Sequence, residues 1–97
     1  MYSNYEEMVM HTQANIINLL TDLANKKGLL LDPYSWIWND GETRELPKPG
    51  EDWKLDFSSH GNPCRVIFTK EDLVAFNNSQ TTSVREKLEA GIDNLLY

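Results

Sequence analysis

The fold is decided by residues 53–57, Trp53-Lys54-Leu55-Asp56-Phe57, in which apolar and polar side chains alternate without exception. Successive side chains of a β-strand point to opposite faces, so this pattern is typical of a strand with one buried and one solvated face. Residues 64–68 also place an apolar side chain at every second position. Because turn-forming residues at 58–63 join the two segments, the sequence predicts an antiparallel hairpin.

An aromatic segment at residues 34–39 predicts a further strand, in which Tyr34, Trp36 and Trp38 would share one face. An Asn-Asp-Gly turn follows it, and residues 43–46 are positioned to pair with it as a fourth strand. A row of Tyr and Trp serves either as a wall of the core or as the anchor of a protein interface, and the sequence leaves both open.

A long helix is predicted at residues 4–27. Ser3 and Glu6 have the spacing of a capping box, with Ser3 as the N-cap. Gly28 suits the position just beyond the last turn. Apolar residues recur at the helical period. They would form one buried stripe, made of Tyr5, Met8, Val9, Ile16, Ile17, Leu20, Leu23 and Ala24.

Two helices are predicted in the C-terminal third of the chain. Thr69 would cap a short helix that ends at about Phe76. Ser83 and Glu86 repeat the capping-box spacing and predict a last helix with Ser83 as its N-cap. Its apolar stripe would consist of Val84, Leu88, Ile92 and Leu95.

These elements predict a single α+β domain spanning residues 1–97. It would contain a long N-terminal helix, a three-stranded antiparallel sheet (four-stranded if 43–46 pairs), and a short helix plus a C-terminal helix packed on one face.

The element order is similar to that of the double-stranded-RNA-binding domain. That family, however, grips phosphates with a basic cluster at its last helix, whereas acidic residues outnumber basic ones at 83–97. We therefore reject that assignment.

The composition favours a basic protein partner over nucleic acid. Fifteen acidic and nine basic residues give a net charge of −6. Phosphate neutralisation by Lys and Arg dominates nucleic-acid affinity, so direct binding of DNA or RNA is not expected. A negative field would instead speed the encounter with a basic protein or protein complex. The alternative is that the charge serves solubility alone.

The chain is expected to be a cytoplasmic protein that does not bind membranes. It has one cysteine, so neither an internal disulfide nor a zinc ribbon is expected. The N-terminus lacks the basic region of a secretion signal, and no apolar run approaches the roughly 20 residues of a membrane span.

No catalytic, cofactor or metal site is predicted. The five glycines lie too far apart for a phosphate-binding loop. Glu7 and His11 have helical spacing, which we interpret as a solvated pair rather than a metal site. Cys64 follows His60 by four residues, but its place in the strand pattern favours core packing over reactivity. The carboxylate pairs are expected to stay solvated, namely Asp40/Glu42, Glu51/Asp52 and Glu71/Asp72.

The functional hypothesis is a small non-enzymatic protein that binds and inhibits a basic, nucleic-acid-binding protein by presenting an acidic, phosphate-mimicking face. In size and acidity the chain is similar to small phage-type inhibitors of host-defence nucleases, anti-CRISPR proteins among them, although no shared motif supports the similarity. The expected partner-binding residues are Glu6, Glu7, Asp22, Trp36, Trp38, Asp40, Glu42, Glu45, Glu51 and Asp52. Two alternatives remain open: an immunity or antitoxin protein, and a small enzyme or redox protein that uses Cys64 and His60.

Overall fold

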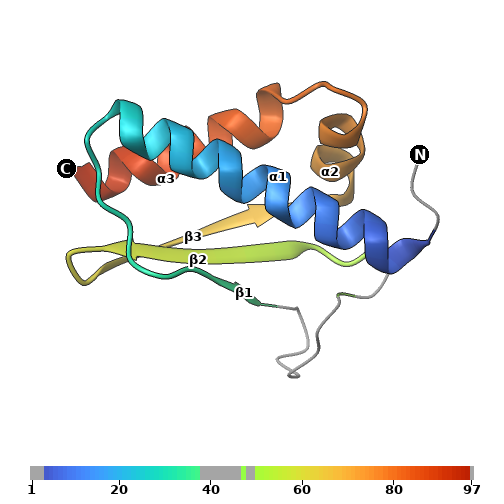
Figure 1. The fold of residues 1–97 in the computed structure, drawn as a ribbon, viewed down its shortest axis with the longest axis horizontal. Helices are drawn as coiled ribbons and strands as arrows, with labels where there is room; N and C mark the ends of the chain where they lie inside the picture. The colour runs from blue at the N-terminus through green and yellow to red at the C-terminus, as the bar shows by residue number, and fades with distance from the viewer. Residues whose placement is uncertain (1–3, 38–46, 48–49, 97) are drawn as a thin grey trace.

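A computed structural model describes residues 4–37, 47 and 50–96 of the chain. Within these residues it has three helices and three strands, which confirms the predicted α+β class (Figure 1). None of the described helices is long and apolar enough to cross a membrane. The elements follow in the order α1 (Tyr5–Lys26), β1 (Ser35–Ile37), β2 (Trp53–Ser59), β3 (Asn62–Phe68), α2 (Lys70–Asn77) and α3 (Thr82–Leu96).

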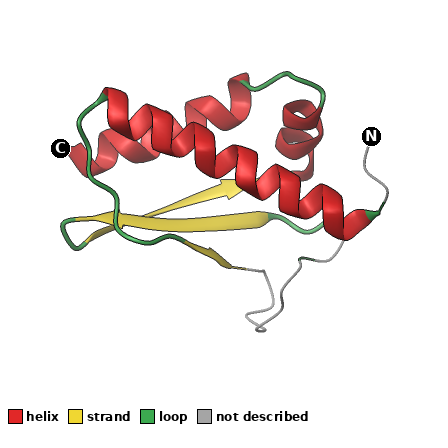
Figure 2. Ribbon diagram, viewed as in Figure 1, coloured by secondary structure: helices red, strands yellow, loops and turns green. Residues whose placement is uncertain are grey.

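The strands form an antiparallel sheet in the order β1-β2-β3, with all three helices on one of its faces (Figure 2). Leu55 at the centre of β2 lies opposite Trp36 of β1 and Val66 of β3. The predicted alternation in β2 is confirmed, since every second residue from Trp53 to Ser59 is buried. The opposite face of the sheet carries polar residues such as Asp56, and none of the described helices covers it.

The β2–β3 hairpin is tighter than predicted. The connection was expected at 58–63, but the structure turns on His60 and Gly61 alone, with φ of 51° and 81°. Two successive positive φ values are typical of the type I′ turn, which matches the twist of the flanking strands. Ser59 stays in the strand because its side chain is buried and its hydroxyl donates to the Leu30 carbonyl at 2.5 Å.

The N-cap of α1 is Asn4 rather than the predicted Ser3. The Asn4 side-chain oxygen accepts a hydrogen bond from the Glu7 backbone N–H at 2.8 Å. Asn and Ser are about equally good N-caps, so composition did not discriminate between adjacent candidates. The predicted apolar stripe is confirmed: Val9, Ile16 and Leu20 are fully buried in the core.

At the junction of α2 and α3, one predicted cap is confirmed and the other is wrong. Thr69 and Asp72 form a reciprocal capping box at the start of α2. The last helix, however, begins at Thr82, and the Ser83 hydroxyl donates to Asp72 instead of capping α3. Asp72 also pairs with Lys87 at 2.5 Å and is only 7% exposed. The expectation that the Glu71/Asp72 pair stays solvated is therefore wrong for Asp72.

Helix α3 lies very close to the sheet at Gly91. A Cβ atom at this position would lie 3.0 Å from both Cys64 Sγ and Phe57 Cζ. Residues on either side of Gly91, namely Leu88 and Ile92, are fully buried against the same sheet. The glycine thus lets the helix backbone approach β2 and β3 directly.

Candidate partner-binding surface

Four of the expected partner-binding carboxylates lie at one end of the molecule, and we call Glu6, Glu7, Glu51 and Asp52 the acidic end. The first pair belongs to the first turn of α1, and the second directly precedes β2. Tyr5 and Glu51 line the same groove, which places the two segments side by side. The Tyr5 hydroxyl also donates to the Pro47 carbonyl at 2.8 Å. Tertiary packing thus brings together acids that are about 45 residues apart in the chain.

The groove beside the acidic end has a volume of about 360 Å³. We call it the N-terminal groove. Most of its wall is apolar, with Glu51 and Lys70 as its charged lining residues. Pockets of roughly this size are at the lower end of the range for ligand sites, which suits a side chain or two of a partner. The apolar wall consists of Tyr5, Met8, Trp53, Leu73 and Val74.

Several acidic residues outside the acidic end are already neutralised by intramolecular ion pairs. These pairs are Arg65–Asp56 at 2.6 Å, Lys87–Asp72 at 2.5 Å, Arg85–Glu89 at 3.4 Å and Lys27–Asp93 at 2.6 Å. Glu6 and Asp52, by contrast, have no ion pair with a Lys or Arg in the part of the chain that the structure describes. No Lys or Arg of the described residues therefore neutralises these two charges.

Asp22 does not join the acidic end. It lies sixteen residues after Glu6 on the same helix, a distance of about 24 Å along the axis at about 1.5 Å per residue. The remaining expected residues, Trp38, Asp40, Glu42 and Glu45, lie outside the described residues, as does the expected fourth strand at 43–46.

The aromatic row divides between core and surface. Trp36 faces the helices, with its ring edge-on to Trp53 at a centroid distance of 5.8 Å and tilted against Phe68 at 6.3 Å. Tyr34, two residues earlier, is 48% exposed. Trp36 is therefore built into the wall of the core, and it remains only partly accessible.

The arrangement of Cys64 and His60 does not favour cysteine chemistry. His60 is exposed in the hairpin turn, while Cys64 is partly buried against the core below α3. Burial, followed by the charge of Asp56, raises the pKa of the Cys64 thiol. A nucleophilic cysteine needs the opposite shift, because the thiolate is the reactive form.

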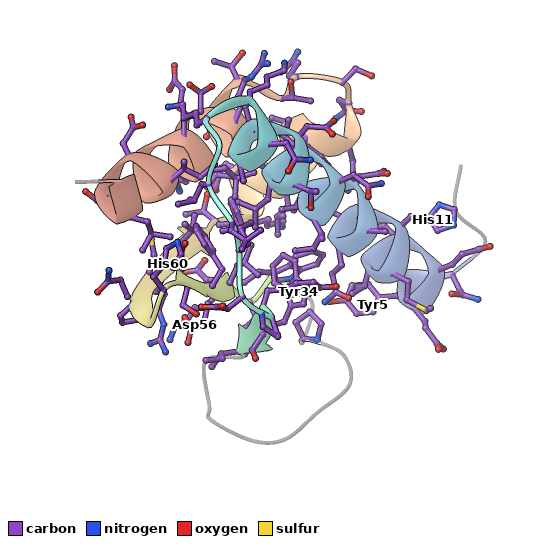
Figure 3. The ribbon with its side chains drawn as sticks, turned by 60° about the vertical axis from the view of Figure 1, so that its left-hand side comes forward. Tyr5, His11, Tyr34, Asp56 and His60 are labelled. Carbon is purple, nitrogen blue, oxygen red and sulfur yellow. The ribbon has the colours of Figure 1, made fainter. Side chains whose placement is uncertain are left out.

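The two histidines lie far apart. Figure 3 shows His11 on the outer side of α1, while His60 lies at the tip of the hairpin. Across the described ranges, no group of three or more His, Cys, Asp or Glu side chains is arranged to hold a metal ion. The Glu7–His11 spacing does not therefore extend to a metal site among these residues.

Sequence reasoning missed the apolar wall of the N-terminal groove. Tyr5 and Met8 were assigned to the core stripe of α1, which they join only in part. The residue that could have indicated this wall is Val74, an apolar residue on α2 that is 52% exposed.

Comparison of the chain with protein-family models, curated proteins and solved structures finds no match.

Proposed function

We propose that this protein is a small non-enzymatic binding protein that uses its acidic end to engage, and thereby inhibit, a basic protein partner in the cytoplasm. The observation that supports the proposal is that Glu6 and Glu7, in the first turn of α1, lie at the same end of the molecule as Glu51 and Asp52, of which Glu51 lines an apolar groove. Charge attracts and orients the partner, while the groove offers an apolar contact that is independent of salt.

Inhibition would follow from competition. A partner that binds nucleic acid presents Lys and Arg side chains toward the phosphates. The carboxylates of the acidic end would form ion pairs with the same Lys and Arg side chains. The protein would then exclude nucleic acid from that surface without any chemical step.

The experiment is affinity capture from a lysate of the source cells, followed by kinetics with the purified partner. Glu51→Gln/Asp52→Asn and Glu6→Gln/Glu7→Gln each remove two charges from the acidic end. Asp22→Asn/Glu86→Gln removes two exposed charges from elsewhere on α1 and α3 and serves as the matched control. All three variants have the same net charge.

We expect each acidic-end variant to slow association by about threefold or more at low salt, because steering depends on local charge. The control should retain most of the rate. Excess nucleic acid should displace the protein from its partner. An association rate that is the same for all variants and unaffected by salt would refute the proposal, as would a captured partner with an acidic binding surface.

A further inference from the structure

A second groove lies near the other end of α1, between that helix and the segment that leads into β1. Its volume is about 300 Å³. We call it the C-terminal groove. The α1 side is formed by residues such as Ile17, Thr21 and Ala24, and the opposite side by residues 29–32 and Tyr34. Nothing in the proposed function uses this surface.

The segment opposite α1 is held rigidly by hydrogen bonds to β2. The Asp32 backbone N–H donates to the Ser58 carbonyl at 2.9 Å, and the Ser58 hydroxyl donates to the Asp32 carboxylate at 3.1 Å. The buried hydroxyl of Ser59 donates to the Leu30 carbonyl at 2.5 Å. Both sides of the groove are therefore formed before any partner binds, which lowers the entropic cost of docking.

This rigid segment presents large apolar side chains to solvent. Leu30 is 74% exposed, although its neighbour Leu29 is buried in the core. Tyr34 is 48% exposed and lines the same groove. Exposed apolar side chains that gather on a fixed surface are typical of interaction sites, whereas single scattered ones are not.

The negative charge of Asp32 favours a positively charged partner segment in the C-terminal groove. Asp32 is its only charged lining residue, and no Lys or Arg pairs with it within residues 4–37, 47 and 50–96. Lys27 is engaged by Asp93 at 2.6 Å. Lys26 follows Ala24 by two residues and therefore points about 160° away from it around the helix. Among the described residues, the groove thus combines an apolar wall with one carboxylate that no Lys or Arg neutralises.

We propose that the C-terminal groove docks a segment of a partner protein in which a leucine-type side chain adjoins a lysine or arginine. The apolar side chain would enter between Thr21 and Tyr34, and the cation would pair with Asp32. A second copy of this chain is a poor occupant, because each copy carries a net charge of −6. The proposal does not depend on the acidic end, so the two can fail separately.

The experiment is a titration of the isotope-labelled full chain, followed by amide chemical shifts in NMR spectra. The probe is the peptide acetyl-Arg-Leu-Leu-Arg-amide. Acetyl-Arg-Ser-Ser-Arg-amide tests the apolar contact, and acetyl-Glu-Leu-Leu-Glu-amide tests the charge. We expect saturable shifts at Thr21, Asn25 and Asp32 with the first peptide. Removing a buried leucine contact should weaken binding by about tenfold.

Asp32→Asn should weaken binding of the first peptide by about two- to fivefold, as expected for one solvent-accessible ion pair. Asparagine keeps an oxygen that can accept the Ser58 hydrogen bond, so the segment should remain in place. Glu86→Gln, an exposed carboxylate on α3 that is not among the residues given for either groove, is the control and should not change the affinity. Spectra that are unchanged away from the substituted residue verify that both variants fold.

Four results would overturn the proposal. The first is the absence of saturable shifts at the groove, and the second is equal binding of the acidic-flanked peptide. The third is a dependence of the Leu30 and Tyr34 shifts on protein concentration without peptide, which would assign the groove to self-association. Shifts confined to Glu6, Glu7 and residues 50–52 would also refute it, while leaving the proposed function intact.

Discussion

The junction between α2 and α3 and the acidic end both contain carboxylates, but they use them in opposite ways. At the junction, Asp72 is buried and accepts hydrogen bonds from Lys87, Ser83 and the Thr69 backbone N–H. At the acidic end, Glu6 is exposed and has no cationic partner among the described residues. The difference teaches that the donors around a carboxylate, not its abundance in the sequence, decide whether it serves stability or remains available for binding.

The pKa of Asp72 is lowered by its hydrogen-bond donors, as expected for a carboxylate that stabilises the fold. Burial alone raises this pKa, but hydrogen bonds from Lys87, Ser83 and the Thr69 backbone, together with the charge of Lys87, lower it to about 2. The charged form is therefore favoured in the folded state despite desolvation.

The largest loss of stability is expected from a larger side chain at Gly91, where α3 lies closest to the sheet. Gly91→Val would place a branched side chain where even a Cβ atom is 3.0 Å from Cys64 Sγ and Phe57 Cζ. We expect a loss of about 3 kcal/mol in the free energy of unfolding, because overpacking strains a dense core. Chemical denaturation measures it. Ala90→Val, on the exposed side of α3, is the control and should cost about 0.5 kcal/mol.

If Gly91→Val is as stable as Ala90→Val, α3 must be able to move away from the sheet at little cost. The packing of α3 on the sheet would then be less rigid than its contacts indicate.

The second effect concerns Asp72 itself. Asp72→Ala removes the side-chain acceptor of the Thr69 backbone N–H in the α2 capping box and the carboxylate that Lys87 and Ser83 share, so that Lys87 keeps only the Ile67 carbonyl. We therefore expect a loss of about 2–3 kcal/mol. Glu71→Ala changes the adjacent, exposed carboxylate in the same helical turn and should cost only a few tenths of a kcal/mol. Thermal and urea unfolding of both variants provide the measurement. Equal effects for the two variants would mean that the buried network contributes nothing beyond the helix dipole.

The third effect is the pH dependence that Asp72 contributes to stability. The folded pKa of Asp72 is about 2, below the ordinary value of about 3.9. Its contribution is therefore fully present above about pH 4 and is lost as the pH falls through the folded pKa. Integrated over this window, about 2 kcal/mol of stability should disappear.

The measurement is urea unfolding of the wild type and of Asp72→Asn between pH 2 and 6. The variant should have the flatter profile, since it lacks the titrating group. A difference between the two proteins that stays constant across this range would contradict the assignment to Asp72.

The smallest effect is expected at the acidic end. Replacing all four of its carboxylates with the matching amides should change the free energy of unfolding by about 1 kcal/mol or less, mainly through the weaker dipole interaction at the start of α1. Four changes here should thus cost less than Asp72→Ala alone. Circular dichroism with urea unfolding tests this. A loss that exceeds the effect of Asp72→Ala would show that these carboxylates are structural.

The helices and strands themselves were predicted from the sequence more accurately than the residues at which they begin and end. The long stripe of α1 and the alternation in β2 were predicted correctly, because each is a periodic pattern over many residues. The caps at Ser3 and Ser83 were predicted wrongly, since several neighbouring residues have suitable side chains and only the packing chooses among them. The six-residue connection at 58–63 became a two-residue turn for a similar reason: the contact of Ser59 with Leu30 is not visible in a local pattern.

For the binding surfaces, the sequence identified acidic residues but not their grouping. It predicted Glu6, Glu7, Glu51 and Asp52 as candidates along with Asp22, which lies farther along α1. It also did not single out Asp32 or Leu30, because a lone acid and a leucine in a short apolar run carry no pattern. Their exposure depends on how the segment after α1 is held by β2.

By itself, the sequence determined the order of helices and strands, the faces they bury and the negative charge of the protein, because periodicity and composition are local or additive properties. The tertiary structure alone decided which carboxylates are buried and which are grouped at the surface. It also decided where grooves remain between α1 and its neighbours. Such features depend on contacts between residues that are distant in the chain, as when Tyr5 meets Pro47 and Ser58 meets Asp32.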